Sequence, residues 1–180
     1  MEQHYKGLAV TAAIVAAIGL SLLAMLAVLN RRDQAVGLNQ EIQYDDFAFS
    51  VLGVRKANSF GSGDSQTNVR GVYYVVTLKI ANHAQRVDYT FKKASAILVD
   101  HQGREFHLSD DGQQKLESTQ STKCNGPIPA GGSCTTEIAF DLPADALPSQ
   151  LRISEGGSIG DILDVVFYGK KRIEIGATQR

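Results

Sequence analysis

The chain has 180 residues, and its 18 basic and 19 acidic residues leave a formal net charge of −1 at pH 7. Because these charges are mixed along the chain, it has no basic patch of the kind that nucleic-acid binding requires, and no nucleic acid is expected as a partner. The sequence also has no internal repeat and no low-complexity run, so neither a repeat protein nor a disordered protein is indicated.

The first predicted element, Leu8–Leu29, carries no charge and consists almost entirely of Leu, Ala, Val and Ile. At about 1.5 Å per residue, a helix of this length spans roughly 33 Å, which is enough to cross the core of a bilayer. The segment is longer than the apolar core of a cleavable signal peptide, and it lacks the polar face of a buried helix. We therefore predict an uncleaved single-pass transmembrane helix at residues 8–29, preceded by a short cytoplasmic tail at residues 1–7.

The charges beside this helix do not decide which way it points. Lys6 precedes the helix, and Arg31 and Arg32 follow it. A count of Lys and Arg alone mildly favours a cytoplasmic carboxyl side. The free amino terminus adds a positive charge on the other side, however, and a short tail is easily kept inside while a large domain is exported. Both orientations stay open on the charges.

The same helix has small residues at steps of four, namely Ala9, Ala13, Ala17 and Ser21. Such a stripe lets two helices approach closely in lipid, so it indicates a possible homodimer. A segment this rich in Ala also produces that spacing by chance. The monomer and the homodimer therefore both remain open at this stage.

Residues 30–43 are polar and are predicted to form a linker, and residues 44–176 have the size of one domain. Apolar and polar residues alternate along most of this domain, which predicts half-buried β-strands. The predicted strands are Tyr44–Val54, Val72–Ala81, Val87–Phe91, Ala94–Val99, Arg104–Leu108, Thr135–Leu142, Leu151–Ser154 and Lys171–Ile175. Gly53 indicates a bulge. The strand Val72–Ala81 begins with apolar residues on both faces, so we expect it in the middle of a sheet.

Two short helices are expected among these strands. The polar segment Ser109–Thr122 has room for a surface helix around Gln113–Leu116. Apolar residues at helical spacing predict an amphipathic helix at Ile159–Phe167 that packs on the sheet, with Ser158 as its N-cap and Gly169 as its terminator.

The chain has two cysteines, Cys124 and Cys134, in a segment rich in turn-forming residues. In an oxidising compartment such a pair forms a disulfide. Closing this loop is worth about 2.5–3 kcal/mol in the chain-entropy model. A reduced pair in a cytosolic domain is the alternative, and two thiolates are too few for a structural zinc site. The pair favours an exported domain, and we adopt that orientation.

The sequence offers few candidates for chemistry. His101 and His107 flank a predicted hairpin near Glu105 and Asp110, which gives a possible metal site, but a metal needs three or four convergent ligands. The loop Asn58–Ser65 is rich in Gly and Ser, yet it lacks the G-x-S-x-G pattern of a nucleophile elbow. We therefore assign no catalytic, cofactor-binding or metal-binding residue.

Four segments resemble a known family: Tyr73–Asn82, Leu98–Phe106 with its D-x-x-G-R-x-F pattern, Ile128–Gly132 and Ile138–Pro143. They are similar to telokin-like, immunoglobulin-like extracellular domains of bacterial envelope proteins of uncharacterised function. The resemblance covers about Tyr44 to Ile175. It implies an exported domain on a lipid or helix anchor, without enzymatic activity. Because no anchor cysteine is present, the helix must provide the attachment.

The sequence thus predicts a mainly β protein. Its fold is an immunoglobulin-like antiparallel β-sandwich with one short C-terminal helix, preceded by a single N-terminal transmembrane helix. We expect a protein of the cytoplasmic membrane whose extracytoplasmic domain is a non-enzymatic interaction module. It would bind an envelope protein through loops or a sheet edge. The alternative is a small-molecule or metal carrier that uses the region of His101 and His107.

Overall fold

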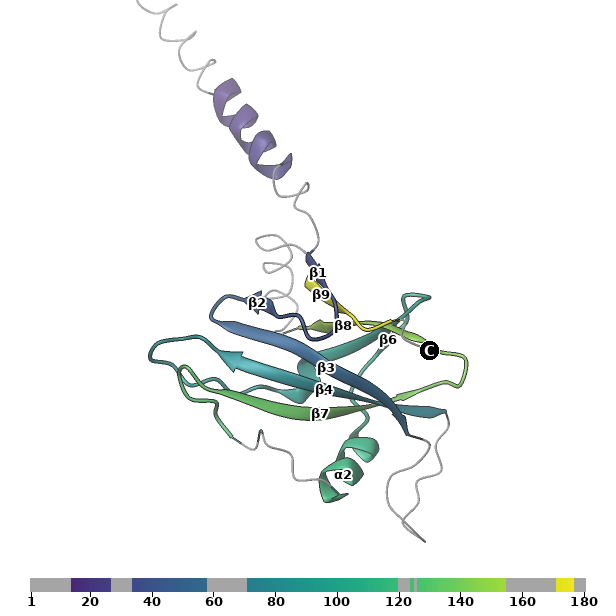
Figure 1. The fold of residues 1–180 in the computed structure, drawn as a ribbon. Coiled ribbons are helices and arrows are strands. Elements are labelled where there is room, and N and C mark those ends of the chain that lie inside the picture. The colour runs from purple at the N-terminus through teal and green to yellow at the C-terminus, as the bar shows by residue number, and fades with distance from the viewer. Residues whose placement is uncertain are drawn as a thin grey trace, which may run out of the picture.

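The computed structural model describes residues 14–26, 34–57, 71–119, 124, 126–154 and 171–176. Within these ranges the strands form two sheets that pack face to face (Figure 1). In the five-stranded sheet the order is β1 Gln34–Val36, β9 Lys171–Glu174, β8 Pro148–Ile153, β5 Ala96–Asp100 and β6 Glu105–Phe106. In the four-stranded sheet it is β2 Ile42–Tyr44, β3 Phe47–Ala57, β4 Val72–Asn82 and β7 Ser133–Leu142. The predicted β-sandwich is confirmed.

The strand β4 lies between β3 and β7, as its two apolar faces predict. One face packs Val76, Leu78 and Ile80 into the core between the sheets, where all three are fully buried. The opposite face carries Tyr73 and Val75 in a second, smaller apolar cluster. Because successive side chains of a strand alternate between faces, one strand contributes to both clusters.

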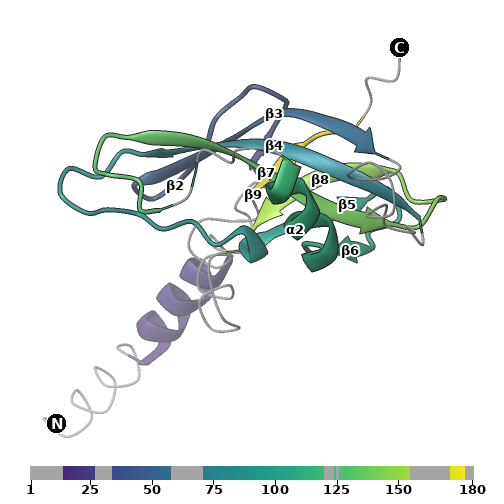
Figure 2. The same ribbon diagram turned by 90° about the horizontal axis from the view of Figure 1, so that it is seen from below.

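The second cluster is closed by the helix α2, Asp110–Thr119 (Figure 2). Leu116 supplies its fully buried apolar side chain from this helix. A Cβ atom at Gly112 would lie only 2.7 Å from the ring of Tyr73, so a glycine lets the helix approach the sheet closely. The helix predicted around Gln113–Leu116 is confirmed and is longer than expected.

The register of β3 against β4 shifts between Val51 and Gly53, which confirms the predicted bulge. The extra residue of the bulge is Leu52, and 40% of its surface is exposed. A bulge leaves one residue outside the regular alternation, and here that residue is a leucine that points away from the core.

The remaining segments differ from the prediction in the linker 30–43 and at Val87–Phe91. Residues 34–36 form β1, although they fall in the predicted linker 30–43. No strand forms at Val87–Phe91, where Tyr89 makes an isolated bridge to Ile128. The predicted helix Ile159–Phe167 lies outside the described residues.

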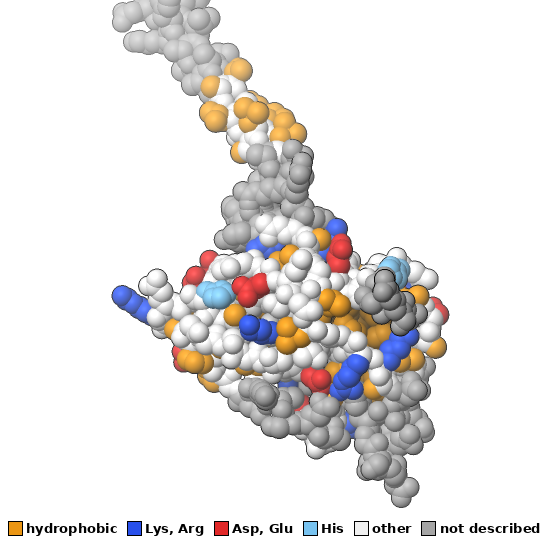
Figure 3. All heavy atoms as spheres, viewed as in Figure 1, with side chains coloured by type: hydrophobic (Ala, Val, Ile, Leu, Met, Phe, Trp, Pro, Cys, Tyr) orange, Lys and Arg blue, Asp and Glu red, His pale blue; other side chains and the backbone are white. Residues whose placement is uncertain are grey.

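The amino-terminal segment is helical over residues 14–26, and the rest of the predicted span Leu8–Leu29 lies outside the described residues. Its large hydrophobic side chains are 54% to 69% exposed, and Figure 3 shows them along the helix. Among the residues that can be described, no helix is both long enough and apolar enough to cross a membrane.

Because Leu116 is the buried anchor of α2, we expect Leu116→Ala to lower the free energy of unfolding by about 2–4 kcal/mol. Amide hydrogen exchange should accelerate in α2 more than in β5 or β8. The exposed neighbour Gln114 is the control, since Gln114→Ala should change stability by less than about 0.5 kcal/mol. Equal acceleration across both sheets would contradict a local role for Leu116.

Candidate functional site

Asn82, the last residue of β4, is fully buried, and its side-chain amide makes three hydrogen bonds. The Nδ2 group donates to the carbonyl oxygens of Val87 at 2.8 Å and Ile128 at 3.0 Å. The Oδ1 atom accepts from the backbone N–H of Ala84 at 3.0 Å. One amide therefore joins β4 to the loop that follows it and to the loop between the cysteines.

The loop between the cysteines is held by further backbone hydrogen bonds. The N–H of Tyr89 donates to the carbonyl of Ile128 at 2.9 Å, and the N–H of Ile128 donates back at 2.7 Å. The N–H of Gly132 donates to the carbonyl of Pro129, and Gly131 has a φ of 73°, which closes a tight turn that favours glycine. The ring of Tyr89 stacks on Phe47 with centroids 3.9 Å apart. Tyr89 is therefore held by this stacking and by its bridge to Ile128, although it belongs to no β-strand.

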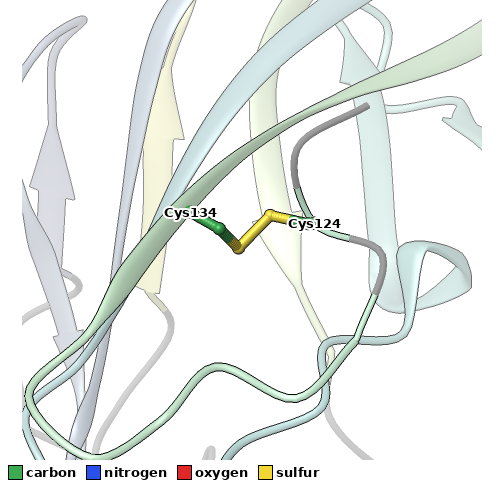
Figure 4. The surroundings of a disulfide bond; sticks show 2 residues. All are labelled: Cys124 and Cys134. Atoms are coloured by element: carbon green, nitrogen blue, oxygen red, sulfur yellow. A yellow bond between two sulfur atoms is a disulfide. The ribbon is translucent and has the colours of Figure 1, made fainter. Parts of the chain in front are cut away.

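The structure has the predicted disulfide between Cys124 and Cys134, with Cα atoms 5.5 Å apart. It joins the second residue of β7 to the segment after α2 (Figure 4). Both cysteines are half-buried. They line a surface hollow of about 170 Å³, together with residues of the intervening loop, Gly126, Pro127, Ile128, Pro129 and Ser133.

The predicted hairpin after β5 is built around the buried carboxylate of Asp100. Its Oδ1 accepts from the N–H groups of Gln102 at 2.8 Å and Arg104 at 2.9 Å, and its Oδ2 accepts from Nε of Arg104 at 2.7 Å. Gly103, with a φ of 79°, completes the turn. Burial alone would raise the pKa of Asp100, but these hydrogen bonds outweigh it and hold the pKa below its ordinary value. The D-x-x-G-R pattern is thus a structural motif.

The two sides of the four-stranded sheet differ in their covering: β7 is an edge strand, and β3 lies beside the short edge strand β2. On β7, the side chain of Gln113 accepts from the N–H of Ala139 at 3.0 Å and donates to the carbonyl of Glu137 at 3.1 Å. The N–H of Ser109 also donates to the carbonyl of Ala139. The segment that begins α2 therefore occupies this edge in place of a strand.

On β3, the strand β2 pairs only with Phe47–Phe49, and one further bond runs from Asn39 to the carbonyl of Val51. Beyond the bulge, the described residues provide no strand on the outer side of β3 as far as Ala57. Leu52 in the bulge and Leu38 in the preceding turn are 40% and 38% exposed. We call the region from Leu52 to Ala57 the open edge, because no strand among the described residues pairs with its outer side.

Two cations lie on this open edge. Arg55 makes an ion pair with Glu137 at 3.2 Å, and the ammonium group of Lys56 lies 5.4 Å from the ring centroid of Tyr74. Positive charge on an exposed strand discourages uncontrolled pairing between copies of a protein.

The histidine candidates do not form a metal centre in the described part of the chain. His101 and His107 are both exposed, and His83 lies 3.2 Å from Glu41 at the surface. No group of three or more His, Cys, Asp or Glu side chains in the described ranges is arranged to hold a metal ion. The loop Asn58–Ser65 lies outside those ranges.

Sequence reasoning missed the roles of two residues. Asn82 stands at the end of the predicted strand, and an Asn after an apolar run was its only signal. Gln113 lies in a polar segment and carries no signal, because its partners are more than 20 residues away in β7.

The profile of a family described as "Domain of unknown function (DUF4352)" matches residues 36–161. Two solved structures are similar in fold. MPT63, a secreted protein from Mycobacterium tuberculosis, is 15% identical with a TM-score of 0.54, covering 81% of this chain and 99% of that chain. The yjhA protein from Bacillus subtilis is 11% identical with a TM-score of 0.52, covering 78% of this chain and 99% of that chain. No curated protein matches the sequence. At these identities the likeness supports the fold alone, and it does not single out telokin-like domains.

Because Asn82→Ala removes three hydrogen bonds in a buried position, including the acceptor of the buried N–H of Ala84, we expect it to lower the free energy of unfolding by about 2–4 kcal/mol. Urea unfolding followed by circular dichroism measures this change. Gln85, exposed on the same loop, provides the control, and Gln85→Ala should stay within about 0.5 kcal/mol of the parent. A loss of similar size in both variants would argue against the role of the amide.

The lowered pKa of Asp100 predicts a pH dependence. The ionised carboxylate stabilises the fold above its unfolded pKa of about 3.9, and this contribution disappears as the pH falls through the lower, folded pKa. Asp100→Asn should therefore be less stable than the parent at pH 7, and the difference should shrink below about pH 4. Unfolding curves between pH 7 and pH 2.5 test this, with exposed Asp145→Asn as control. A constant difference over that range would refute the assignment.

Proposed function

This chain belongs to the DUF4352 family of domains of unknown function, and we propose that it displays its β-sandwich on the outer side of the cytoplasmic membrane as a non-enzymatic protein-interaction module. The observation that carries this proposal is the apolar helix at residues 14–26. It stands apart from the sandwich, so the sandwich does not cover its side chains (Figure 1). We also propose that the sandwich is of the telokin-like, immunoglobulin-like type found in envelope proteins.

The exposed side chains of this helix require an apolar environment. Ile14, Ile18 and Leu22 are more than half exposed, and so are Val15, Leu20, Leu23, Met25 and Leu26. Moving eight such side chains from water into hydrocarbon is worth on the order of 10 kcal/mol. Because they lie all around the helix, a single groove on a partner would leave part of them in water. The hydrocarbon core of a bilayer surrounds a helix on all sides, and residues 8–29 are the proposed membrane-spanning segment.

Two observations support an extracytoplasmic domain. A disulfide persists in oxidising compartments, and the structure contains one between Cys124 and Cys134. One protein of similar fold is described as secreted. Under this proposal the tail at residues 1–7 stays in the cytoplasm.

The partner would meet the open edge of β3. An extended segment of an envelope protein can add there as a strand, with backbone hydrogen bonds to β3 and apolar contact to Leu38 and Leu52. Lys56 favours a partner segment that carries carboxylates.

The carrier alternative has less support in the described residues. The hollow beside the disulfide, at about 170 Å³, is smaller than the roughly 300–1,000 Å³ of small-molecule pockets. Pairing of two helices through Ala17 and Ser21, which border a groove on the described helix, stays a prediction from the sequence.

Site-specific photo-crosslinking in living cells tests the interaction surface. A benzophenone amino acid replaces Leu52 or Lys56 on the open edge, or Gln114 on the exposed face of α2 as a matched control. We expect ultraviolet light to give a discrete cross-linked product from the open edge and none from Gln114. The absence of a product at both edge positions, or the same product from all three, would overturn the proposed surface.

Protease treatment of spheroplasts tests the topology in the same strain. We expect the domain to be digested in intact spheroplasts and the protein to sediment with membranes after carbonate washing. Complete protection of the domain would place it inside, and release by carbonate would exclude a spanning helix.

A further inference from the structure

We infer that the Cys124–Cys134 disulfide is a redox-exchangeable site in the folded protein, open to a dithiol reductant of the thioredoxin type. The first argument is that the loop between the cysteines does not depend on this bond. Ile128 is fixed by the amide of Asn82 and by two backbone hydrogen bonds to Tyr89. The N–H of Asn82 donates to the carbonyl of Gly132, which fixes the other end of the loop. Cleavage of the disulfide therefore leaves this loop in place.

The second argument is access. Both cysteines are half-buried, and both line the hollow of about 170 Å³ at the surface. The other residues around that hollow are Gly126, Pro127, Ile128, Pro129 and Ser133, and none of them is charged. An approaching thiolate thus meets no carboxylate among the residues that line the hollow, and so no local repulsion.

The exchange proceeds in two balanced steps. A thiolate of the dithiol attacks Sγ of Cys124, the Sγ–Sγ bond breaks, and its electron pair leaves on Sγ of Cys134, which takes a proton from water. The second thiol of the reductant, as a thiolate, then attacks the mixed disulfide and releases Cys124, which is protonated in turn. The protein gains two electrons and two protons, and the dithiol becomes a disulfide.

Reduction has a local consequence at α2. This helix ends at Thr119, and Cys124 is the covalent tie between the chain that follows and β7. Without the tie, α2 is held by Leu116 and by the contacts of Gln113 with β7. Reduction of the disulfide therefore lowers the stability of α2 on the edge of β7, while the two sheets stay folded.

The test uses the full chain in detergent micelles, with dithiothreitol as the probe and no denaturant. A maleimide stops the reaction by alkylating free thiols, and mass spectrometry counts the labels on each protein chain. We expect two labels to appear in minutes to about an hour, with the β-sheet circular dichroism unchanged. Labelling that requires urea would overturn the inference.

A core variant separates exchange in the folded state from exchange after global unfolding. Leu151 lies fully buried in β8 of the opposite sheet, so Leu151→Ala populates the unfolded state at least about 20-fold more. The reduction rate should stay within about twofold of the parent, and a rise of 20-fold or more would show that unfolding is required. As a second check, the double variant Cys124→Ser/Cys134→Ser should keep the parent's circular dichroism spectrum. Its failure to fold would also overturn the inference.

Discussion

The irregular end of this sandwich depends on one buried amide, that of Asn82. The donors and the acceptor of a buried amide need hydrogen-bond partners within the protein, because burial removes the hydrogen bonds that water would make with them. Three backbone groups from two loops meet this requirement together. One of these groups belongs to the buried Ile128, which also exchanges two backbone hydrogen bonds with Tyr89. The amide thus converts two flexible connections into fixed parts of the fold.

Much of the sandwich could be predicted because the decisive information is local. Period-two alternation identified β4 and β7, and the apolar start of β4 on both faces correctly indicated a central strand. The structure adds the reason, since Leu116 of α2 covers the face that the core does not use. The turn at Asp100 could also be predicted, because the N–H groups that its carboxylate binds and the glycine at positive φ, Gly103, all lie within five residues.

Other features could not be read because their cause lies far away in the chain. The segment Val87–Phe91 alternates like a strand, yet its rings pack on Phe47 and Phe49 from a loop. The three residues of β1 form a strand only because β9, more than 130 residues later in the chain, lies beside them. In the candidate site, the open edge of β3 depends on how far β2 extends, and nothing in the sequence of β3 itself sets that limit.

The strand β1 lies where a force on the amino-terminal segment would first reach the sandwich. It is the point where the chain enters the sandwich, it pairs in parallel with β9 over three residues, and it lies at the edge of its sheet. If the helix at residues 14–26 anchors the protein as proposed, a pull on it loads these few hydrogen bonds first, while the fully buried core residues of β4 and β7 lie in the other sheet. Under that proposal, detachment of β1 would lengthen the connection to the membrane by several residues before the core bears any load.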